Sequence, residues 1–572
     1  MTDSSESQTI FEEKQNVIEK NEPIKMADFS PLAKQLFKDY QYYYQSLKPK
    51  GEVSYIHVDE IASKVAVFYE NLLRVINWKE EQLVRRTAIE RKLKRRLITE
   101  ISGFGIIATN LNPNKIAHAL VLESIRGGHL PNNQIPQSKL KDVENILDKY
   151  IYILKNLSNA QERASSDVKL KVQFYNWLLE IAACEIEETL APPLRENALI
   201  NSMARTLEER IRVRPQGSIG DSEKRVQIYI TVHRTLFHLD DPIISYRLLR
   251  WQHPDWVNMS ESAYQQAAKN IIKIRQEIQA QLNCPWSGEF FKIGEKYNTL
   301  WLILGDILDQ FKKNPEDIII KFSDKEAFNQ SIREAYEKRY KTLKSRLLKM
   351  GIFSSLSVMI ANIFSLLVVE IPVAKILYGG IKPWAMVADI VVPTLIMIGL
   401  VSAYKLPGKS NVERLIDEIY QIIYQQQGEE IYEVRIKHSR KIITTIFITL
   451  FYFLGLVISL GAIIWILRAI HLPPTSVAIN TLLATIMIFG AMVVRQRAKE
   501  LAVEDKTTFM EFTIDILSIP VGKLGQWLAT KWKKYNIFSV FFTALIDMPF
   551  FAIISFIESW SSFLKERKSE IH

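Results

Sequence analysis

At 572 residues the chain is too long for one ordinary domain, and we expect roughly two or three folding units. Its apolar content of 48% is ordinary for a soluble protein, but the long apolar runs all follow Met350, which predicts a membrane protein with a large soluble region. A net charge of +10 suits a protein that contacts nucleic acid or an anionic membrane surface. Cys184 and Cys284 have no zinc-ligand spacing, so we expect two buried thiols in a reducing compartment.

Residues 1–27 are polar and acidic and contain no apolar core segment, so they do not form a signal peptide. We expect a disordered tail there. Ser30 and Pro31 then provide a favourable N-cap and first turn, which predicts a helix directly after them.

Helical periodicity dominates residues 28–345, for which we predict an all-α cytosolic region. Two lobes, divided near 127–137 or near 214–222, remain open as an alternative. The segment 225–237 also shows the alternation of a strand, but neighbouring helices and the lack of a partner strand favour a helix. The helical patterns cover approximately 30–47, 57–101, 114–126, 138–157, 168–190, 192–213, 221–239, 242–251 and 259–282.

Four later runs reach the length of about 20 mostly apolar residues that a membrane-spanning helix needs. They cover approximately 350–371, 385–403, 442–467 and 475–494. Basic residues collect on every second connection between them, which is the positive-inside pattern. We therefore predict a four-span helical membrane domain over 346–500, with the region 28–345 and the N-terminus in the cytoplasm. A bacterial inner membrane is the expected location because no organelle-targeting signal is present.

Six basic residues directly precede the first apolar run, in the sequence KRYKTLKSRLLK. Cations beside an anionic leaflet are attracted to it by about 1 kcal/mol each. We therefore predict contact with the membrane surface at Lys338, Arg339, Lys341, Lys344, Arg346 and Lys349.

Residues 501–572 are predicted to form an amphipathic interfacial segment that is followed by a re-entrant one. Trp527 and Trp532 lie near Lys533 and Lys534, a pattern typical of a helix at the level of the lipid head groups. We expect these four side chains to contact the membrane surface.

The apolar run 538–559 is interrupted by Asp547 and Pro549. A re-entrant path is favoured because a fifth span would bury Asp547, at a cost of about 2.5–3.5 kcal/mol, and would move the basic C-terminal residues outside. If the run is a fifth span, Asp547 is a candidate intramembrane functional acid.

Glu370, Lys375 and Asp389 fall toward the outer ends of the first two apolar runs. Ionisable residues inside a membrane are functional candidates by default. Residues this close to the interface, however, commonly extend to water or pair with one another. We therefore favour a structural cluster at the outer edge over a conduction or proton path.

Two further charged stretches could bind ligands. The stretch 85–96, RRTAIERKLKRR, could hold phosphates or lipid head groups, but its apolar stripe favours an ordinary helix with one solvated face. The second stretch contains Glu180, Cys184, Glu187 and Glu188, whose spacing an amphipathic helix explains.

Histidine and aspartate gather in residues 233–256 and could hold a divalent metal. His233 and His238, however, do not share a helix face, since five residues turn a helix by about 140° beyond a full turn. Asp240 and Asp241 are also suited to capping the next helix.

The sequence therefore predicts a protein that acts by binding and scaffolding at the membrane rather than by catalysis, with no catalytic, metal or cofactor site. The expected partners are a bilayer with anionic lipids and an unidentified protein, whereas nucleic acid is disfavoured because the chain is tethered to a membrane. Two alternatives remain open: a small channel or transporter gated by the cytosolic region, and a membrane-tethered enzyme centred on 233–256.

Overall fold

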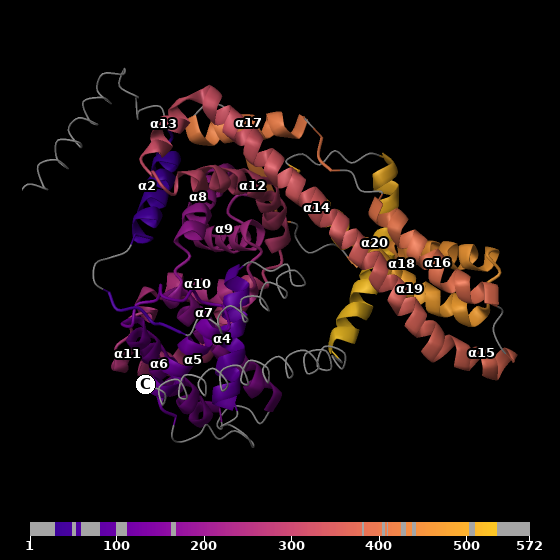
Figure 1. Ribbon diagram of the computed structural model, residues 1–572, viewed down its shortest axis with the longest axis horizontal. Coiled ribbons are helices and arrows are strands. Elements are labelled where there is room, and N and C mark those ends of the chain that lie inside the picture. The colour runs from indigo at the N-terminus through magenta and orange to yellow at the C-terminus, as the bar shows by residue number, and fades with distance from the viewer. Residues whose placement is uncertain are drawn as a thin grey trace, which may run out of the picture.

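The computed structural model describes residues 29–48, 53–58, 81–98, 111–161, 168–379, 383–402, 406–408, 410–424, 431–436, 442–502 and 509–534. These residues are almost wholly helical, as the periodicity predicts (Figure 1). In chain order the elements are α2 (Pro31–Ser46), α4 (Glu81–Ile98), α5 (Pro113–Arg126), α6 (Lys139–Gln161), α7 (Val168–Leu190), α8 (Leu194–Arg210), β1 (Ile211–Arg214), α9 (Asp221–Leu236), α10 (Asp241–Gln252), η2 (Pro254–Trp256), α11 (Glu261–Leu282), α12 (Ser287–Leu308), η3 (Asp309–Phe311), α13 (Asp317–Ser323), α14 (Lys325–Ser365), η4 (Leu366–Glu370), α15 (Ile371–Tyr378), α16 (Pro383–Ser402), α17 (Ser410–Tyr424), β2 (Tyr432–Arg435), α18 (Ile442–Ala469), α19 (Pro474–Ala498) and α20 (Phe509–Lys534).

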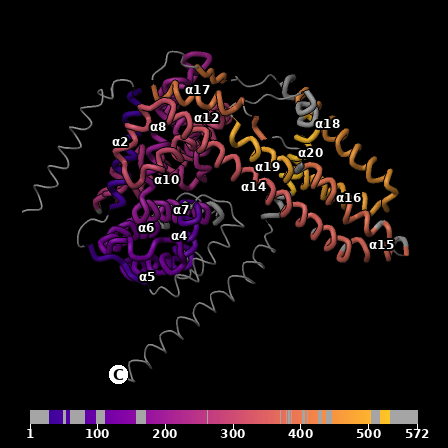
Figure 2. Tube along the Cα trace, turned by 45° about the horizontal axis from the view of Figure 1, so that its top comes forward, coloured from indigo at the N-terminus to yellow at the C-terminus, as the bar shows by residue number. Residues whose placement is uncertain are grey.

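The elements form two bodies that are joined by α14 (Figures 1 and 2). The globular region contains α2 to α13, the first part of α14, α17 and the two strands. The apolar bundle contains the rest of α14, η4, α15, α16, α18, α19 and α20. We call the end of the bundle beside the globular region its near end, and the end at α15 its far end.

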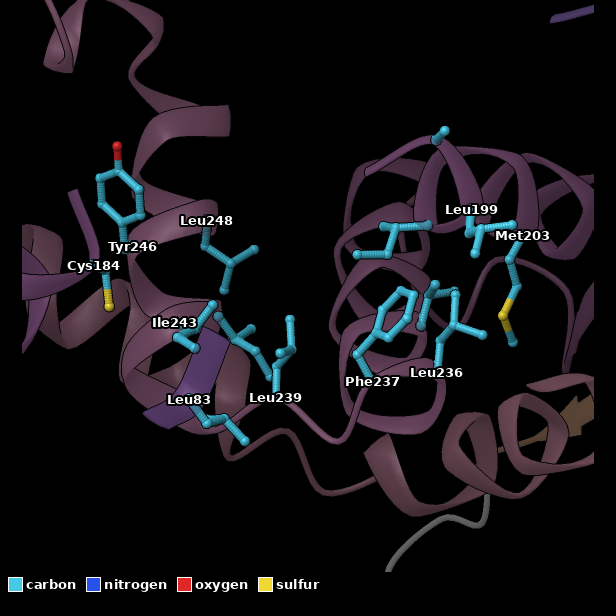
Figure 3. Packing of buried hydrophobic residues seen from close by; sticks show 14 of the residues in the cluster. Leu83, Cys184, Leu199, Met203, Leu236, Phe237, Leu239, Ile243, Tyr246 and Leu248 are labelled. Atoms are coloured by element: carbon cyan, nitrogen blue, oxygen red, sulfur yellow. The ribbon is translucent and has the colours of Figure 1, made fainter. Parts of the chain in front are cut away.

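One continuous hydrophobic core holds the globular region together. Figure 3 shows this core on both sides of the link between α9 and α10, where Phe237 lies beside Leu236 and Met203, and Leu239 lies near Ile243. The alternating apolar residues of 225–237 belong to α9 and not to a strand. The alternation arises because α9 is buried on most of its surface, so its apolar residues need not follow one stripe.

Two short segments differ from the predicted all-α pattern. The strands β1 and β2 form a parallel pair, with Ile211 opposite Tyr432 and Arg214 opposite Arg435. Residues 53–58 are extended and not the start of a helix, because the N–H of Ile56 donates to the carbonyl of Ile135 at 2.9 Å. In both places the backbone hydrogen bonds go to a partner that is distant in sequence.

A continuous helical path leads from the globular region to the far end of the bundle. The side chain of Asp324 caps its start by accepting a hydrogen bond from the N–H of Ala327 at 3.0 Å. The path Lys325–Ile376 has 52 residues and is therefore about 78 Å long at 1.5 Å per residue. Near its end the helix widens into the π-helical turn η4, two residues before Pro372, whose backbone nitrogen cannot donate a hydrogen bond to the preceding turn.

Three helices in the described part of the chain are long and apolar enough to cross a membrane: Lys325–Ile376, Ile446–Ala469 and Pro474–Ala498. The predicted second run is also helical, as α16, but its apolar stretch Met386–Leu400 is shorter. The apolar bundle is thus compatible with a membrane protein.

The connection between α16 and α18 is not merely a loop, because α17 and β2 lie within it. Ile419 and Ile423 of α17 are fully buried in the globular core. The backbone N–H of Ser30 donates to the carbonyl of Ile423 at 2.8 Å, and the Ser30 hydroxyl donates to the carbonyl of Ile422 at 2.6 Å. The predicted N-cap Ser30 therefore also joins α2 to α17, in addition to capping α2.

Helix α20 crosses the middle of α18 and α19. The hydroxyl of Ser459 donates to the carbonyl of Leu517 at 2.9 Å. A Cβ atom added at Gly525 would lie 2.1 Å from the carbonyl oxygen of Thr485, so only glycine permits this approach. If α20 lay flat on a membrane surface, it would contact the ends of α18 and α19. Its contacts with Ser459 and Thr485 instead lie near the midpoints of these helices.

Candidate functional site

Two carboxylic acids meet inside the far end of the apolar bundle. Glu370 ends the π-helical turn, Asp389 lies in the second turn of α16, and Ser476 and Asn480 share one face of α19. We call these four residues the carboxyl cluster. Each of them has an exposed fraction of 4% or less.

A single hydroxyl bridges the two acids of the carboxyl cluster. The Oγ atom of Ser476 is 2.9 Å from Oε2 of Glu370 and 2.9 Å from Oδ2 of Asp389. The Nδ2 group of Asn480 donates to Oδ1 of Asp389 at 2.9 Å. Because a serine hydroxyl has one hydrogen, it donates to one carboxylate only. The other contact becomes favourable when a proton or a small cation is shared between the two acids.

The predicted pairing of the acids of the first two apolar runs with one another is thus present, but Lys375 does not join it. The Lys375 side chain is exposed. In the described part of the chain, Glu370 and Asp389 take hydrogen bonds from neutral side chains. Sequence reasoning did not include Ser476 and Asn480. Their spacing of four residues near the start of an apolar helix was the available signal.

The six basic residues before the first apolar run lie on α14, between the two bodies. Arg339 faces α12, where its Nη2 group is 2.8 Å from Oδ1 of Asp306 and 3.3 Å from the carbonyl of Leu302. The exposed members of the set are Lys338, Lys341, Lys344, Arg346 and Lys349. Their contact with anionic lipid stays a prediction.

The predicted interfacial residues lie on α20 or beyond it. Trp527 is exposed, with a fraction of 55%. Trp532, Lys533 and Lys534 belong to the last turn of α20, and their side chains lie outside the described part. Asp547 and the run 538–559 lie wholly outside the described residues.

Two side chains of the globular region hold the chain directly after α19. The Thr299 hydroxyl donates to the carbonyl of Glu500 at 2.8 Å. The Asn411 amide donates to the carbonyl of Leu501 at 2.7 Å and to the hydroxyl of Tyr336 at 3.1 Å. Thr299, Asn411 and Leu501 are all buried. The near end of α19 is therefore attached to the globular region independently of α14.

A buried ionic network surrounds α7, and it explains the acids that the sequence placed there. Glu187 accepts from Nε of Arg85 at 2.8 Å, and Glu188 accepts from Nε of Arg247 at 2.9 Å. Glu185, which sequence reasoning missed, accepts from Nζ of Lys149 at 2.6 Å. An acid among the apolar residues of a buried helix was the signal for Glu185. These contacts assign a structural role to the acids, since each is paired with a cation.

Burial shifts the pKa values of this network. It raises the pKa of Glu187 to about 7, although Arg85 acts in the opposite direction. It also raises the pKa of Glu185 and lowers the pKa of Lys149, because desolvation disfavours the charged form of either group.

The basic stretch 85–96 has the predicted apolar stripe at Ile89 and Leu93 and exposed positions at Arg91 and Arg95, but several of its other cations face inward. Besides the Arg85 pair, Nη2 of Arg86 is 2.6 Å from Oδ2 of Asp240, and Nζ of Lys92 donates to the carbonyl of Glu123 at 3.0 Å. Arg86 and Lys92 are buried. These cations stabilise contacts between helices.

The residues of 233–256 have separate structural roles. His233 is buried, with Nδ1 2.7 Å from the carbonyl of Tyr229, and burial lowers its pKa. Asp240 caps α10, as predicted, by accepting from the N–H of Ile243. Among the described residues, no three His, Cys, Asp or Glu side chains gather to hold a metal ion.

A cleft of about 920 Å³ opens beside the α7 network, between α6, α10 and the start of α11. Both signs of charge line it, including Asp148, Lys149, Glu188 and Arg250. Burial and the nearby Glu144 carboxylate raise the pKa of Asp148. Such a lining suits a polar segment of a partner better than an apolar ligand.

No family model, curated protein or solved structure matches this chain.

Proposed function

We propose that the protein is a multi-pass membrane protein that presents a helical binding region at the cytoplasmic face of the cell membrane, most simply a bacterial inner membrane. The observation that carries this proposal is the continuous path Lys325–Ile376, which belongs to both bodies. The contacts of Thr299 and Asn411 with the residues after α19 add a second attachment. A binding region held this way keeps a defined orientation to the bilayer.

The distribution of charge supports the proposed orientation and the use of α16 as a fourth span. Basic residues at the near end of the bundle belong to α14, α17 and α19 with its C-cap. They are Arg346, Lys349, Arg414, Arg495, Arg497 and Lys499. Lys375, Arg468 and His471 are the described basic residues nearest the far end. The positive-inside rule favours a cytoplasmic near end.

The binding proposal is tested with the full chain in lipid nanodiscs as an affinity bait. We expect a protein partner that is retained by the wild type and lost when Asn145→Trp and Asp148→Lys fill and recharge the cleft. Lys312→Glu with Lys313→Glu, at exposed positions away from the cleft, is the matched control. Equal recovery from all three proteins, or none from any, would overturn the cleft as the binding site.

The carboxyl cluster favours a second candidate, the binding and passage of protons or small cations. Two buried acids around one hydroxyl are what a shared proton or cation requires. Proteoliposomes with an internal pH or sodium dye distinguish the two functions. Flux that Asp389→Asn and Ser476→Ala each abolish would establish transport. Absence of flux, with both variants folded and inserted, would leave the cluster as a structural contact between helices.

A further inference from the structure

A second cavity, of about 560 Å³, lies where the globular region meets the near end of α19. Helix α12 contributes Lys292 and Lys296 to its lining, and α19 with the residues after it contributes Arg497 and Lys499. His238, which follows α9 in the left-handed region at φ 48°, completes one side. We call this cavity the junction pocket.

The junction pocket is more basic than acidic. Four cations line it, against the two carboxylates of Glu295 and Glu500. Several cations around a space of this size attract an anion with several oxygens, because ammonium and guanidinium groups donate hydrogen bonds to each oxygen. A phosphate group meets this requirement.

Two of these cations, Lys292 and Lys296, make hydrogen bonds beside the pocket. Nζ of Lys296 is 3.2 Å from the hydroxyl of Tyr432, and Nζ of Lys292 is 3.1 Å from Oε1 of Glu289. The Lys292 side chain is 70% exposed, so its pair with Glu289 is weakened by water and the ammonium group can exchange it for a ligand in the pocket. The carbonyl of Glu500 is held by Thr299, which keeps the end of α19 in place beside α12.

The pocket also has an apolar side, and part of it belongs to α19. Val493 lines it and is 39% exposed. Val493 lies one turn before Arg497 on the same face of α19. Phe291 and Ala502 add apolar surface. A ligand that fits both sides carries a charged head and an apolar tail.

We propose that the junction pocket binds the head group of an anionic phospholipid, whose acyl chains lie along α19 past Val493. The proposal rests on the proposed function, since it requires the apolar bundle to lie in a bilayer. The lipid phosphate takes hydrogen bonds from Lys292 and Arg497 and thereby joins α12 to α19. The bound lipid adds a third attachment between the globular region and the bundle, beside α14 and the Thr299 and Asn411 contacts.

The test uses the full chain, purified in detergent and titrated with phosphatidylglycerol or phosphatidylcholine, with native mass spectrometry and the thermal midpoint as readouts. We expect phosphatidylglycerol to remain bound and to raise the midpoint, and phosphatidylcholine to do neither. Lys292→Gln with Arg497→Gln should weaken phosphatidylglycerol binding at least tenfold, whereas the control Lys312→Gln with Lys313→Gln should not. Arg497→Lys alone should retain most of the binding, which separates lost charge from lost folding.

Three results would overturn the lipid site. One is equal phosphatidylglycerol binding by the wild type and the Lys292/Arg497 double variant. Another is full stabilisation by inorganic phosphate alone, which would identify a site for a soluble anion. The third is equal binding of both lipids. Flotation with liposomes distinguishes these three results from failure of the proposed function. A chain that does not insert into bilayers does not float, whereas a chain that lacks only the lipid site does.

Discussion

Asn411 donates a hydrogen bond to the carbonyl of Leu501, and the two residues connect helix α17 of the globular region with the end of α19. Both are buried, with exposed fractions of 6% and 3%. A buried amide that makes two hydrogen bonds is costly to remove, because its partners then lose their donor without regaining water. Removal of this contact therefore tests the attachment between the two bodies.

Asn411→Ala should lower the free energy of unfolding by about 1–3 kcal/mol. It should also increase amide hydrogen exchange in residues 495–502 more than in α2. Asn201→Ala, at an exposed position of α8, is the control and should change neither quantity. Unchanged exchange in 495–502 would show that the contact does not hold the end of α19.

Glu187 should make stability depend on pH. Its carboxyl has a pKa of about 7 in the folded protein and an ordinary value of 4.5 when exposed. The folded state therefore binds more protons between these values, and the stability contributed by this group is present below pH 4.5 and lost as the pH rises through 7. Relative to Glu187→Gln, the wild type should lose up to about 3 kcal/mol between pH 4.5 and pH 8.

Thermal midpoints of the two proteins, measured at several pH values in that range, give this difference. Glu316→Gln, at an exposed position, should follow the wild type at every pH. Parallel curves for the wild type and Glu187→Gln would contradict the raised pKa.

The close approach of α20 to α19 should not tolerate a side chain at Gly525. Gly525→Ala places a methyl group against the Thr485 carbonyl, so the helices must separate, at a cost of about 1–3 kcal/mol. Gly461→Ala is the matched control in α18, because nothing lies within 4 Å of its added Cβ. A thermal midpoint that falls only for Gly525→Ala is expected. Equal midpoints would mean that α20 does not pack there.

The proposed orientation predicts which positions an impermeant thiol reagent reaches from outside the cell. Lys375→Cys at the far end should be labelled, and Asp417→Cys in α17 should be labelled only after the membrane is opened. Both positions are exposed, and the native Cys184 and Cys284 are buried and give little background. External labelling of Asp417→Cys would reverse the orientation.

Local signals predicted the helices well. Ser30 and Asp240 cap the helices that follow them, because an N-cap depends only on a side-chain oxygen and the next three residues. The apolar runs also predicted the bundle helices, because a helix forms its backbone hydrogen bonds within its own segment and a local pattern is therefore sufficient.

Contacts between segments that are distant in the sequence could not be predicted from a local pattern. Strands β1 and β2 contain four residues each and pair across more than two hundred positions, so neither shows enough periodicity to predict the other. Half of the carboxyl cluster was predicted, because Glu370 and Asp389 were evident as charges in apolar runs. Ser476 was not predicted, because its contacts with both acids depend on the way three helices pack.

The interleaving of the two bodies along the chain has a consequence for biosynthesis. The core of the globular region contains Ile423 and Val434, which follow α14 and α16, and Leu501, which follows α19. A ribosome must therefore translate every described bundle helix except α20 before that core has all its residues. Chain elongation usually allows an N-terminal domain to fold first. In this protein the core of the earlier helices is incomplete until Leu501 has been synthesised, so a nascent chain that ends before this residue leaves part of the core exposed.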